Sequence, residues 1–356
     1  MKIAGIEAKK VVLPLAKEFR ISLGAVANFE AVFVKVITDE GLFGYGEASP
    51  FAYVTGETCE TVIDAISYIS KALTGLDPFS IEAIHRTMDR VTARNGSAKA
   101  AIDIALYDIM SKAAGVPLYK FLGGSQSNVE TDMTISIDDP QIMGQEAKDL
   151  SNSGFRMLKI KAGGNREADL EAIDLIRKNA PNAHLKIDAN QGWKPAQALE
   201  MARAYEKYGV QSIEQPVPAW DLDGLAYVRR HSPIPIMADE SCFTPQDAFK
   251  IAKLEAADII NIKLMKCGGI YRALQICSVA ESAGIPCMVG CMMESRIAIA
   301  AGAALVASHP NIILADLDSF VELENKNLAT GGFEFDTPVI KLGDASGLGV
   351  ETRLFE

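Results

Sequence analysis

A short apolar run that ends in a charged or polar side chain recurs roughly every 25 residues through the second half of this chain. Every run but the last is followed by a segment with a helical pattern, which predicts a strand-plus-helix unit repeated around a barrel. The C-terminal ends of barrel strands meet at one mouth, so the side chains at the run ends are expected to face one another. These run ends are Lys161, Asp188, Glu214, Asp239, Lys263, Cys291 and Asp316, with Asp318 two residues further on.

The segment before the repeats has a different character. Residues 1 to about 50 are rich in apolar and β-branched residues, and the turn sequence at 38–41 predicts a hairpin between antiparallel strands. Glycine and small residues between positions 19 and 28 predict a mobile loop. Helical patterns follow at residues 57–73, 80–90 and 97–114, the last with Ser97 as its expected N-cap.

The expected fold class is α/β, a modified TIM barrel of the (β/α)7β type with an N-terminal α+β capping domain that the C-terminal tail completes. The first barrel strand is placed in the apolar run at 129–137. After Asp318 the tail contains strand and turn patterns but no strong helix, so it is expected to leave the barrel and rejoin the N-terminal unit. The predicted domains are residues 1–125 for the cap, 126–320 for the barrel and 321–356 for the returning segment.

Lys159 and Lys161 form the first run end together with Ile160. Because side chains alternate faces along a strand, the two lysines share one face. Two ammonium groups on a buried face repel each other and lose hydration, and both effects favour the neutral amine that can act as a base near neutral pH. The alternative is a solvated lysine pair on an edge strand. The polar run ends downstream favour the first interpretation.

Composition limits the partners and the location. A formal net charge of −11 argues against nucleic acid or an anionic membrane as a partner. No apolar run reaches the roughly 18 residues of a transmembrane helix, and the charged N-terminal segment lacks the apolar core of a signal peptide. The six cysteines show no C-x-x-C spacing, which disfavours a zinc site or a disulfide framework. We therefore expect reduced thiols in a cytoplasmic protein, with Cys291 lining the pocket.

Several short motifs carry a resemblance that extends over essentially the whole chain. In order they are Lys159-x-Lys161, Asp188-Ala-Asn190, Glu214-Gln-Pro216, Ala238-Asp239-Glu240-Ser241 and Asn261-Ile262-Lys263. The ordered set resembles the enolase superfamily, and within it the muconate-lactonizing subgroup. The pair Asp316-x-Asp318, preceded by the hexapeptide at 290–295, resembles the dipeptide epimerases of that subgroup, such as the L-Ala-D/L-Glu epimerases.

The resemblance implies a metal and two acid–base residues. Asp188, Glu214 and Asp239 would form a hard oxygen site for one Mg²⁺, and oxygen donors of this kind suit that ion. Lys161 and Lys263, from predicted strands two and six of eight, would lie on opposite faces of a planar enolate. The implied reaction is a 1,1-proton transfer that inverts the α-carbon of the C-terminal residue of an L-Ala-Xaa dipeptide, such as one from cell wall peptide turnover.

The resemblance also implies substrate contacts. Lys159 would touch the substrate carboxylate and depress the pKa of Lys161, and the Asp316–Asp318 pair would bind the α-ammonium of the first residue. Thr134 would contact the substrate from the first strand. Epimerases that prefer Glu as the second residue are expected to offer a cation from the cap, whereas position 24 is Gly and Arg20 is the nearby cation. The sequence around Gly24 suits an apolar or mixed pocket, with Met292 and Met293 as adaptable walls.

Other functions stay open on the sequence alone. A muconate cycloisomerase or an o-succinylbenzoate synthase of the same superfamily would use the same metal ligands and lysines. A barrel that only binds peptides is a further alternative, although a pure binder needs no bases. The expected partner is a small dipeptide, and the expected assembly is a homo-oligomer.

Overall fold

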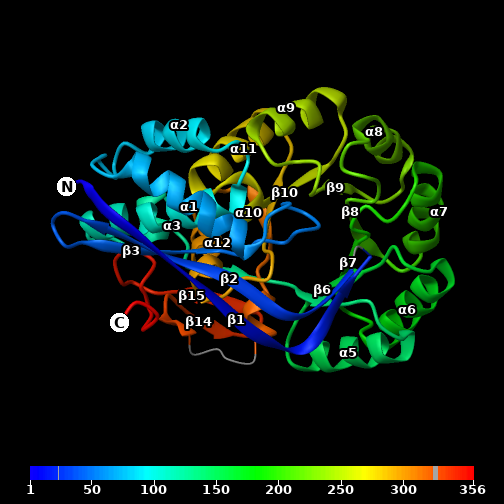
Figure 1. The fold of residues 1–356 in the computed structure, drawn as a ribbon. Helices are drawn as coiled ribbons and strands as arrows, with labels where there is room; N and C mark the ends of the chain where they lie inside the picture. The colour runs from blue at the N-terminus through cyan, green and yellow to red at the C-terminus, as the bar shows by residue number, and fades with distance from the viewer. Residues whose placement is uncertain (23, 324–327) are drawn as a thin grey trace.

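The computed structural model describes residues 1–22, 24–323 and 328–356 of the chain. Its N-terminal part is an antiparallel sheet of three strands with three helices packed on one side (Figure 1). The strands pair in the order β1-β2-β3. These elements are β1 (Ile3–Ile21), β2 (Gly24–Thr38), β3 (Phe43–Ala48), α1 (Cys59–Leu73), α2 (Ile81–Val91) and α3 (Gly96–Ala113).

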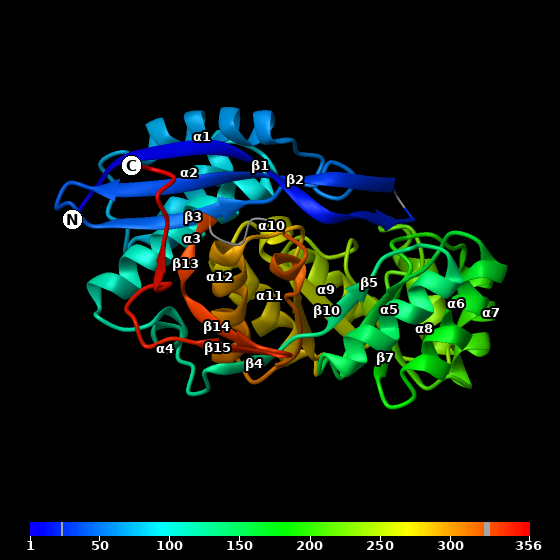
Figure 2. The ribbon, with the colours of Figure 1, turned by 90° about the horizontal axis from the view of Figure 1, so that it is seen from below.

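Strand β2 shows why this sheet forms between two cores. Phe29, Ala31 and Phe33 belong to the large hydrophobic core of the molecule, whereas Val32 and Val34 belong to a separate core with the cap helices. Alternate residues of a strand point to opposite faces, so an apolar run without polar interruptions is buried on both sides. The sheet is therefore a middle layer, with helices on one face and the rest of the molecule beneath it (Figure 2).

The expected mobile loop at 19–28 is largely wrong for the described residues. Strand β1 continues to Ile21 and β2 begins at Gly24, and the pairing Arg20↔Ala25 shows that this segment is the end of a long hairpin. Ser22 donates from Oγ to the carbonyl oxygens of Ala189 and Asn190, at 3.0 Å each. The hairpin thus extends across the barrel mouth and is tied down there, which the small residues alone did not indicate.

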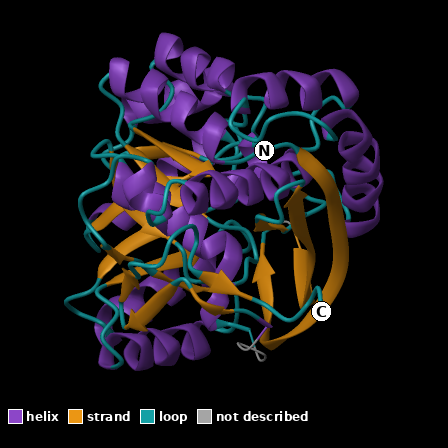
Figure 3. Ribbon diagram, turned by 90° about the vertical axis from the view of Figure 1, so that its left-hand side faces the viewer, coloured by secondary structure: helices purple, strands orange, loops and turns teal. Residues whose placement is uncertain are grey.

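The barrel is an eight-stranded parallel sheet whose strands follow in sequence order. Helices surround these strands, which form a group separate from the cap strands (Figure 3). The strands are β5 (Met133–Ile135), β6 (Met157–Lys161), β7 (His184–Asp188), β8 (Val210–Glu214), β9 (Ile236–Ala238), β10 (Ile259–Lys263), β11 (Cys287–Gly290) and β12 (Ile312–Asp316). The helices are α5 (Pro140–Asn152), α6 (Arg166–Asn179), α7 (Pro195–Glu206), α8 (Leu222–His231), α9 (Pro245–Leu254), α10 (Leu264–Cys267), α11 (Ile270–Ser282) and α12 (Arg296–Ser308).

The first barrel strand is shorter than the apolar run at 129–137 predicts. Only β5 joins the barrel, whereas β4 (Asn128–Glu130) pairs antiparallel with a strand of the tail. The Asp132 amide donates to the carbonyl of Ala315 at 3.3 Å, and the Leu317 amide donates to Thr131 Oγ1 at 2.8 Å. These two bonds connect the first strand to the eighth and bring the barrel close to closure.

Local capping explains where several helices begin. Asp139 and Asn165 accept from first-turn amides of α5 and α6, and Thr244 forms a capping box at α9. Ser97 is not the N-cap of α3, because the helix begins one residue earlier. Its amide and hydroxyl both donate to Glu57 Oε2, at 3.0 and 2.7 Å, so a carboxylate distant in sequence supplies the acceptor.

The tail returns past the barrel to the cap, as expected, and ends beside it (Figure 2). The Lys9 ammonium lies 2.5 Å from the carbonyl of Leu354, and the rings of Tyr45 and Phe355 stack at 5.9 Å. The tail contains one short 3₁₀ helix, η1 (Ser319–Val321), and the strands β13 (Thr330–Gly331), β14 (Phe333–Asp336), β15 (Val339–Leu342) and β16 (Val350–Glu351). The short helix α4 (Leu118–Phe121) ends the cap before β4. Among the described residues no helix is long and apolar enough to cross a membrane, and all six cysteines are free thiols.

Candidate active site

Three buried carboxylates meet at the mouth of the barrel. Asp188 and Glu214 end β7 and β8, and Asp239 directly follows β9. Each offers an oxygen within 4.8 Å of the others. Burial and the nearby Asp188 raise the pKa of Glu214 to about 7. Burial also disfavours the charge on Asp188, but Lys161 and Lys159 hold the pKa of that carboxyl below its usual value. Like charges this close favour a bound cation or protonation of one acid.

The donor set fits Mg²⁺. Oε2 of Glu214 and both side-chain oxygens of Asp239 are buried and accept no hydrogen bond of good geometry from the described residues, although lysine ammonium groups lie near them. Carboxylate oxygens are the ligands that this hard ion prefers, and it is commonly held by few protein groups, with water and substrate completing the shell. Three such groups on consecutive strands form a site of that kind.

Two lysines stand at opposite ends of the carboxylate trio. Lys161 Nζ lies 2.7 Å from Asp188 Oδ2 and donates to Asn190 Oδ1 at 3.1 Å. Lys263 Nζ lies 2.9 Å from Asp239 Oδ2. Their strands, β6 and β10, are four positions apart in a sheet of eight, which places them across the barrel from each other. The structure therefore brings both predicted acid–base lysines to one site from opposite sides.

Lys159 corrects the charge argument made from the sequence. Its Nζ lies 3.0 Å from Asp188 and from Glu214 and 2.7 Å from Asp316. Burial alone lowers the pKa of Lys159, but these carboxylates outweigh it, and the pKa lies well above its usual value. The pKa of Lys263 is raised for the same reason, with Asp239 as the main contributor. The expectation that the Lys159–Lys161 pair favours neutral amines is wrong for Lys159, because it counted the lysines of one strand without the acids beside them.

The Asp316–Asp318 pair lies next to this cluster. Asp316 contacts Lys159, and Asp318 Oδ2 accepts from the Thr134 amide at 2.6 Å. The Cys291 thiol lies 3.8 Å from Asp318 Oδ1. Burial and the neighbouring Asp316 raise the pKa of Asp318. Two carboxylates with few internal donors between them form an acceptor site for a cationic group.

One cavity joins the three lysines to the Asp316–Asp318 pair, with the acid trio beneath the lysines rather than in its wall. It is lined by Lys159, Lys161, Lys263, Thr134 and Asn190, by Cys291, Met292 and Met293, by Asp316, Asp318, Ser319 and Glu322, and from the cap by Phe19, Ile21, Phe51 and Val54. Its free volume is about 70 Å³, so the walls lie close together. Gly24 is not among the lining residues, and a side chain there would meet the ring of Tyr53 at 3.2 Å.

Sequence reasoning assigned no role to three residues that support the site. Asn190 accepts from Lys161 and donates to Glu240 Oε1 at 3.2 Å. Lys266 Nζ lies 2.6 Å from Asp239 Oδ1 and donates to the carbonyl of Asn261 at 3.0 Å. Lys266 therefore helps to fix the position of the Asp239 carboxylate. Asn190 and Glu240 stand inside the motifs at 188–190 and 238–241, and that position was the signal available for them.

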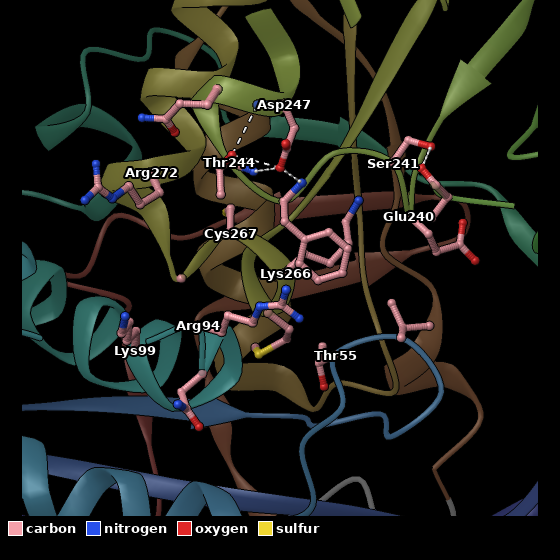
Figure 4. Close-up of a pocket in the computed structure, with 18 of the residues that line it drawn as sticks. Thr55, Arg94, Lys99, Glu240, Ser241, Thr244, Asp247, Lys266, Cys267 and Arg272 are labelled. Carbon is pink, nitrogen blue, oxygen red and sulfur yellow. Dashed lines mark hydrogen bonds between the residues drawn. The ribbon is translucent and has the colours of Figure 1, made fainter. Parts of the chain in front are cut away.

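A larger cavity of about 860 Å³ lies beside the site, between the cap and the β9–α9 and α10 segments (Figure 4). Its charged groups are mostly paired: Asp89 contacts Lys99 at 2.7 Å and Arg272 at 2.6 Å, and Lys266 is directed to Asp239. Neither Lys161 nor Lys263 lines it. Val54 belongs to both cavities, so the loop after β3 lies between this space and the smaller cavity at the lysines.

Two family models together match most of the chain. Residues 5–123 match the mandelate racemase / muconate lactonizing enzyme N-terminal domain, and residues 143–355 match the enolase C-terminal domain-like model. A hydrophobic dipeptide epimerase of Enterococcus faecalis is 44% identical over 98% of this chain and 99% of its own length. An L-Ala-D/L-Glu epimerase of Clostridium acetobutylicum is 43% identical over 95% of this chain and 96% of its own.

Solved structures agree with these relatives. A dipeptide epimerase of Enterococcus faecalis complexed with Mg and L-Leu-L-Tyr has a TM-score of 0.96 at 44% identity, covering 99% of this chain and 100% of that one. A dipeptide epimerase of Cytophaga hutchinsonii complexed with Mg and D-Ala-L-Val has a TM-score of 0.97 at 36% identity, covering 100% and 97%. With its cap, barrel, acid trio and opposed lysines, the chain belongs to the mandelate racemase / muconate lactonizing enzyme family of the enolase superfamily.

Proposed function

We propose that this protein is a Mg²⁺-dependent dipeptide epimerase that inverts the α-carbon of the C-terminal residue. The observation that carries the proposal is the placement of Lys161 and Lys263 at opposite ends of the acid trio, within 2.7 and 2.9 Å of its oxygens. A 1,1-proton transfer with inversion needs one proton acceptor and one donor on opposite faces of the same carbon. The names of the relatives, which are dipeptide epimerases, support the same reaction.

Asp188, Glu214 and Asp239 would hold the Mg²⁺. When bound, the ion supplies positive charge that binds the substrate carboxylate and stabilises the negative charge that develops there as the α-proton leaves. Lys161 or Lys263, whichever faces the α-hydrogen, would take the proton at Nζ as a neutral amine; a cation on the shared acids would offset the carboxylate charge that raises the pKa of Lys263 and so favour that form. The ammonium of the opposite lysine then gives a proton to the other face of the same carbon. The net proton count is unchanged, and the two lysines exchange roles for the reverse reaction.

Asp316 and Asp318 distinguish this reaction from its nearest alternatives. Their carboxylates would bind the α-ammonium of the first residue, while Lys159 would contact the carboxylate end from its place between the trio and Asp316. The substrates of a muconate cycloisomerase or an o-succinylbenzoate synthase carry no ammonium group. A buried acidic pair here therefore favours a dipeptide. Cys291, Thr134 and Met293 are proposed as further walls of the same pocket.

Incubation of L-Ala-Xaa dipeptides in D₂O with Mg²⁺ tests the function directly. We expect one deuterium at the α-carbon of the second residue, together with formation of the other epimer, both visible by mass spectrometry and chiral chromatography. Absence of exchange across a dipeptide library would contradict the proposal. Asp316→Asn should abolish exchange of dipeptides; unchanged activity in this variant would favour the alternatives without an ammonium. A homo-oligomeric assembly and a cytoplasmic location stay predictions.

A further inference from the structure

The reacting α-carbon of the substrate carries four substituents, and the proposed reaction assigns protein contacts to three of them. The carboxylate is directed to the acid trio, the amide nitrogen leads towards Asp316 and Asp318, and the hydrogen faces Lys161 or Lys263. These groups all come from the barrel, below the cap. The remaining substituent is the side chain of the second residue, and the open direction for it is towards the cap elements over the mouth.

The cap presents an apolar wall in that direction. Phe19 and Ile21 line the cavity from β1, and Phe51 and Val54 line it from the loop after β3. The ring centre of Phe19 lies 6.0 Å from Lys161 Nζ, so this wall is within reach of a side chain on the reacting carbon. Ile21 is buried. The Ser22 contacts at 3.0 Å fix the end of β1 over the mouth.

The cations of this part of the cap are directed elsewhere. Arg20 lies between Phe19 and Ile21, so strand alternation places it on the opposite face, and its side chain is 54% exposed beside Glu18. Lys17 contacts Glu146 at 2.9 Å. The cationic residues that line the described cavity are the three lysines of the barrel, each already beside carboxylates. An anionic substrate side chain would be buried here without a cation from the cap.

We propose that the second residue of the substrate is apolar, a branched aliphatic or aromatic side chain, and that Phe19 and Ile21 determine this preference. This inference rests on the proposed function. An apolar side chain gains by leaving water, whereas a carboxylate that loses its hydration without a counter-charge is strongly disfavoured. We expect kcat/KM for L-Ala-L-Leu to exceed that for L-Ala-L-Glu by about 100-fold or more, since unpaired buried polar groups discriminate at least this strongly.

A panel of L-Ala-L-Leu, L-Ala-L-Phe, L-Ala-L-Glu and L-Ala-L-Lys in the Mg²⁺–D₂O exchange assay tests the preference with the wild-type chain. Fast exchange of the Leu and Phe dipeptides with slow exchange of the other two supports it. Equal or faster exchange of the Glu or the Lys dipeptide overturns it while leaving the epimerase function intact. Exchange of none of the four would overturn this inference, and absence of exchange across the wider dipeptide library would overturn the proposed function as well.

Two substitutions at one position then test the wall itself. Ile21→Arg should raise kcat/KM for L-Ala-L-Glu relative to L-Ala-L-Leu by about 10-fold or more, because it supplies the missing cation. Val12→Arg adds the same charge to the same strand at a side chain that is 51% exposed and outside the cavity, and the ratio should not change. If Ile21→Arg fails to fold by circular dichroism, Ile21→Ala decides. It should raise KM for the Leu dipeptide while leaving the Glu dipeptide unaffected, and an unchanged Leu-to-Glu ratio in the folded variant overturns the assignment.

Discussion

Lys161 and Lys263 occupy matching places on opposite strands, yet their surroundings differ. Lys161 has the Asn190 amide oxygen at 3.1 Å and the ring of Phe19 at 6.0 Å, whereas Lys263 has Asp239 at 2.9 Å. Both amines are held by acids of the metal site, so their positions are fixed before substrate binds. Fixed positions on opposite faces mean that each lysine can serve only the epimer whose α-hydrogen points towards it.

Removal of either lysine should therefore stop the interconversion of the two epimers but leave proton exchange of one epimer. We expect Lys161→Ala and Lys263→Ala each to lower epimerisation by about 10²- to 10⁴-fold, the usual contribution of a positioned acid or base. Each variant should still exchange the α-hydrogen of one epimer with D₂O, and the two variants should act on opposite epimers. Separate incubations of the L,L and L,D dipeptides measure this. Lys178→Ala, at an exposed lysine on α6, is the control. A lysine variant that still interconverts both epimers at the wild-type rate would rule out the two-base mechanism.

Asp169 on α6 gives a pH dependence away from the metal site. Burial raises the pKa of this carboxyl to about 6, although the Gly163 amide donates to it at 3.0 Å. Above this pKa the acid is charged in both states, and the folded state bears the cost of burying the charge. As the pH falls towards the ordinary value of 3.8, the folded chain binds a proton before the unfolded chain does, so the stability of the fold rises until the cost of the buried charge has disappeared.

Asp169→Asn should remove that dependence. We expect the variant to be more stable than the wild type by about 1 to 3 kcal/mol at pH 8, from the shift of the pKa, and equally stable near pH 4. Urea unfolding at a series of pH values measures the difference. Glu171→Gln, at an exposed position on the same helix, should show no such trend. A constant difference between Asp169→Asn and the wild type across the series would contradict the assignment.

At the scale of elements, buried acids of the cap bind the first turns of barrel helices. Glu47 on β3 accepts from the Ser295 amide and hydroxyl at 2.7 Å each and from the Ala298 amide at 3.1 Å, at the start of α12. Asp103 on α3 accepts from the Ile270 amide at 2.5 Å, at the start of α11. Helix N-termini carry free amides and a partial positive charge, so a carboxylate from the other domain satisfies both. These contacts fix the cap over the mouth.

Glu47→Gln should weaken this attachment. The glutamine side chain keeps one oxygen that can accept, but its NH₂ group replaces the second oxygen. This NH₂ group would face N–H and O–H groups that also donate, so buried donors would be left unpaired. We expect a loss of about 2 to 3 kcal/mol in the free energy of unfolding. Urea unfolding measures it, with Glu7→Gln, at an exposed acid on β1, as the matched control. An equal effect of both substitutions would show that Glu47 contributes no more than a surface charge.

Helix limits could be predicted from the sequence where the residues next to them, through capping and backbone preference, decide them. The helices expected at 57–73, 80–90 and 97–114 are α1, α2 and α3, each with limits within two residues of those expected, because capping and backbone preference act within a few residues. The hairpin at 19–28 and the strand β4 were misassigned because pairing decides them. Arg20 pairs with Ala25 and Val129 with Ile340, and such partners are not visible in the local pattern.

For the whole molecule, the sequence predicted which polar residues meet but not their charge states. Strand ends in a barrel converge, so the positions of Asp188, Glu214 and Asp239 followed from the repeat. The pKa of Lys159 did not, because it depends on three carboxylates from other strands. The apolar wall of Phe19 and Ile21 also comes from another domain, folded over the mouth. Contacts between domains are the information that a repeat pattern lacks.

The balance of charge across the molecule predicts how Mg²⁺ affects stability. Lys159, Lys161 and Lys263 already lie within 3.0 Å of oxygens of the acid trio, so folding does not depend on the ion. Binding to the folded state alone adds about 2.7 kcal/mol at a hundredfold excess over Kd, which corresponds to a few °C in Tm for a chain of this size. Thermal unfolding with Mg²⁺ and with EDTA should show this increment.

Variants then locate the ion that causes the increment. Glu214→Gln removes one ligand charge from the buried trio, so the Mg²⁺-dependent rise in Tm should largely disappear while the chain stays folded in EDTA. Asp223→Asn, at an exposed acid on α8, keeps the overall change in charge and should retain the full rise. The same rise in Glu214→Gln as in the wild type would place the stabilising ion elsewhere. Unfolding of the wild type in EDTA would instead show that the three ammonium groups do not balance the acids.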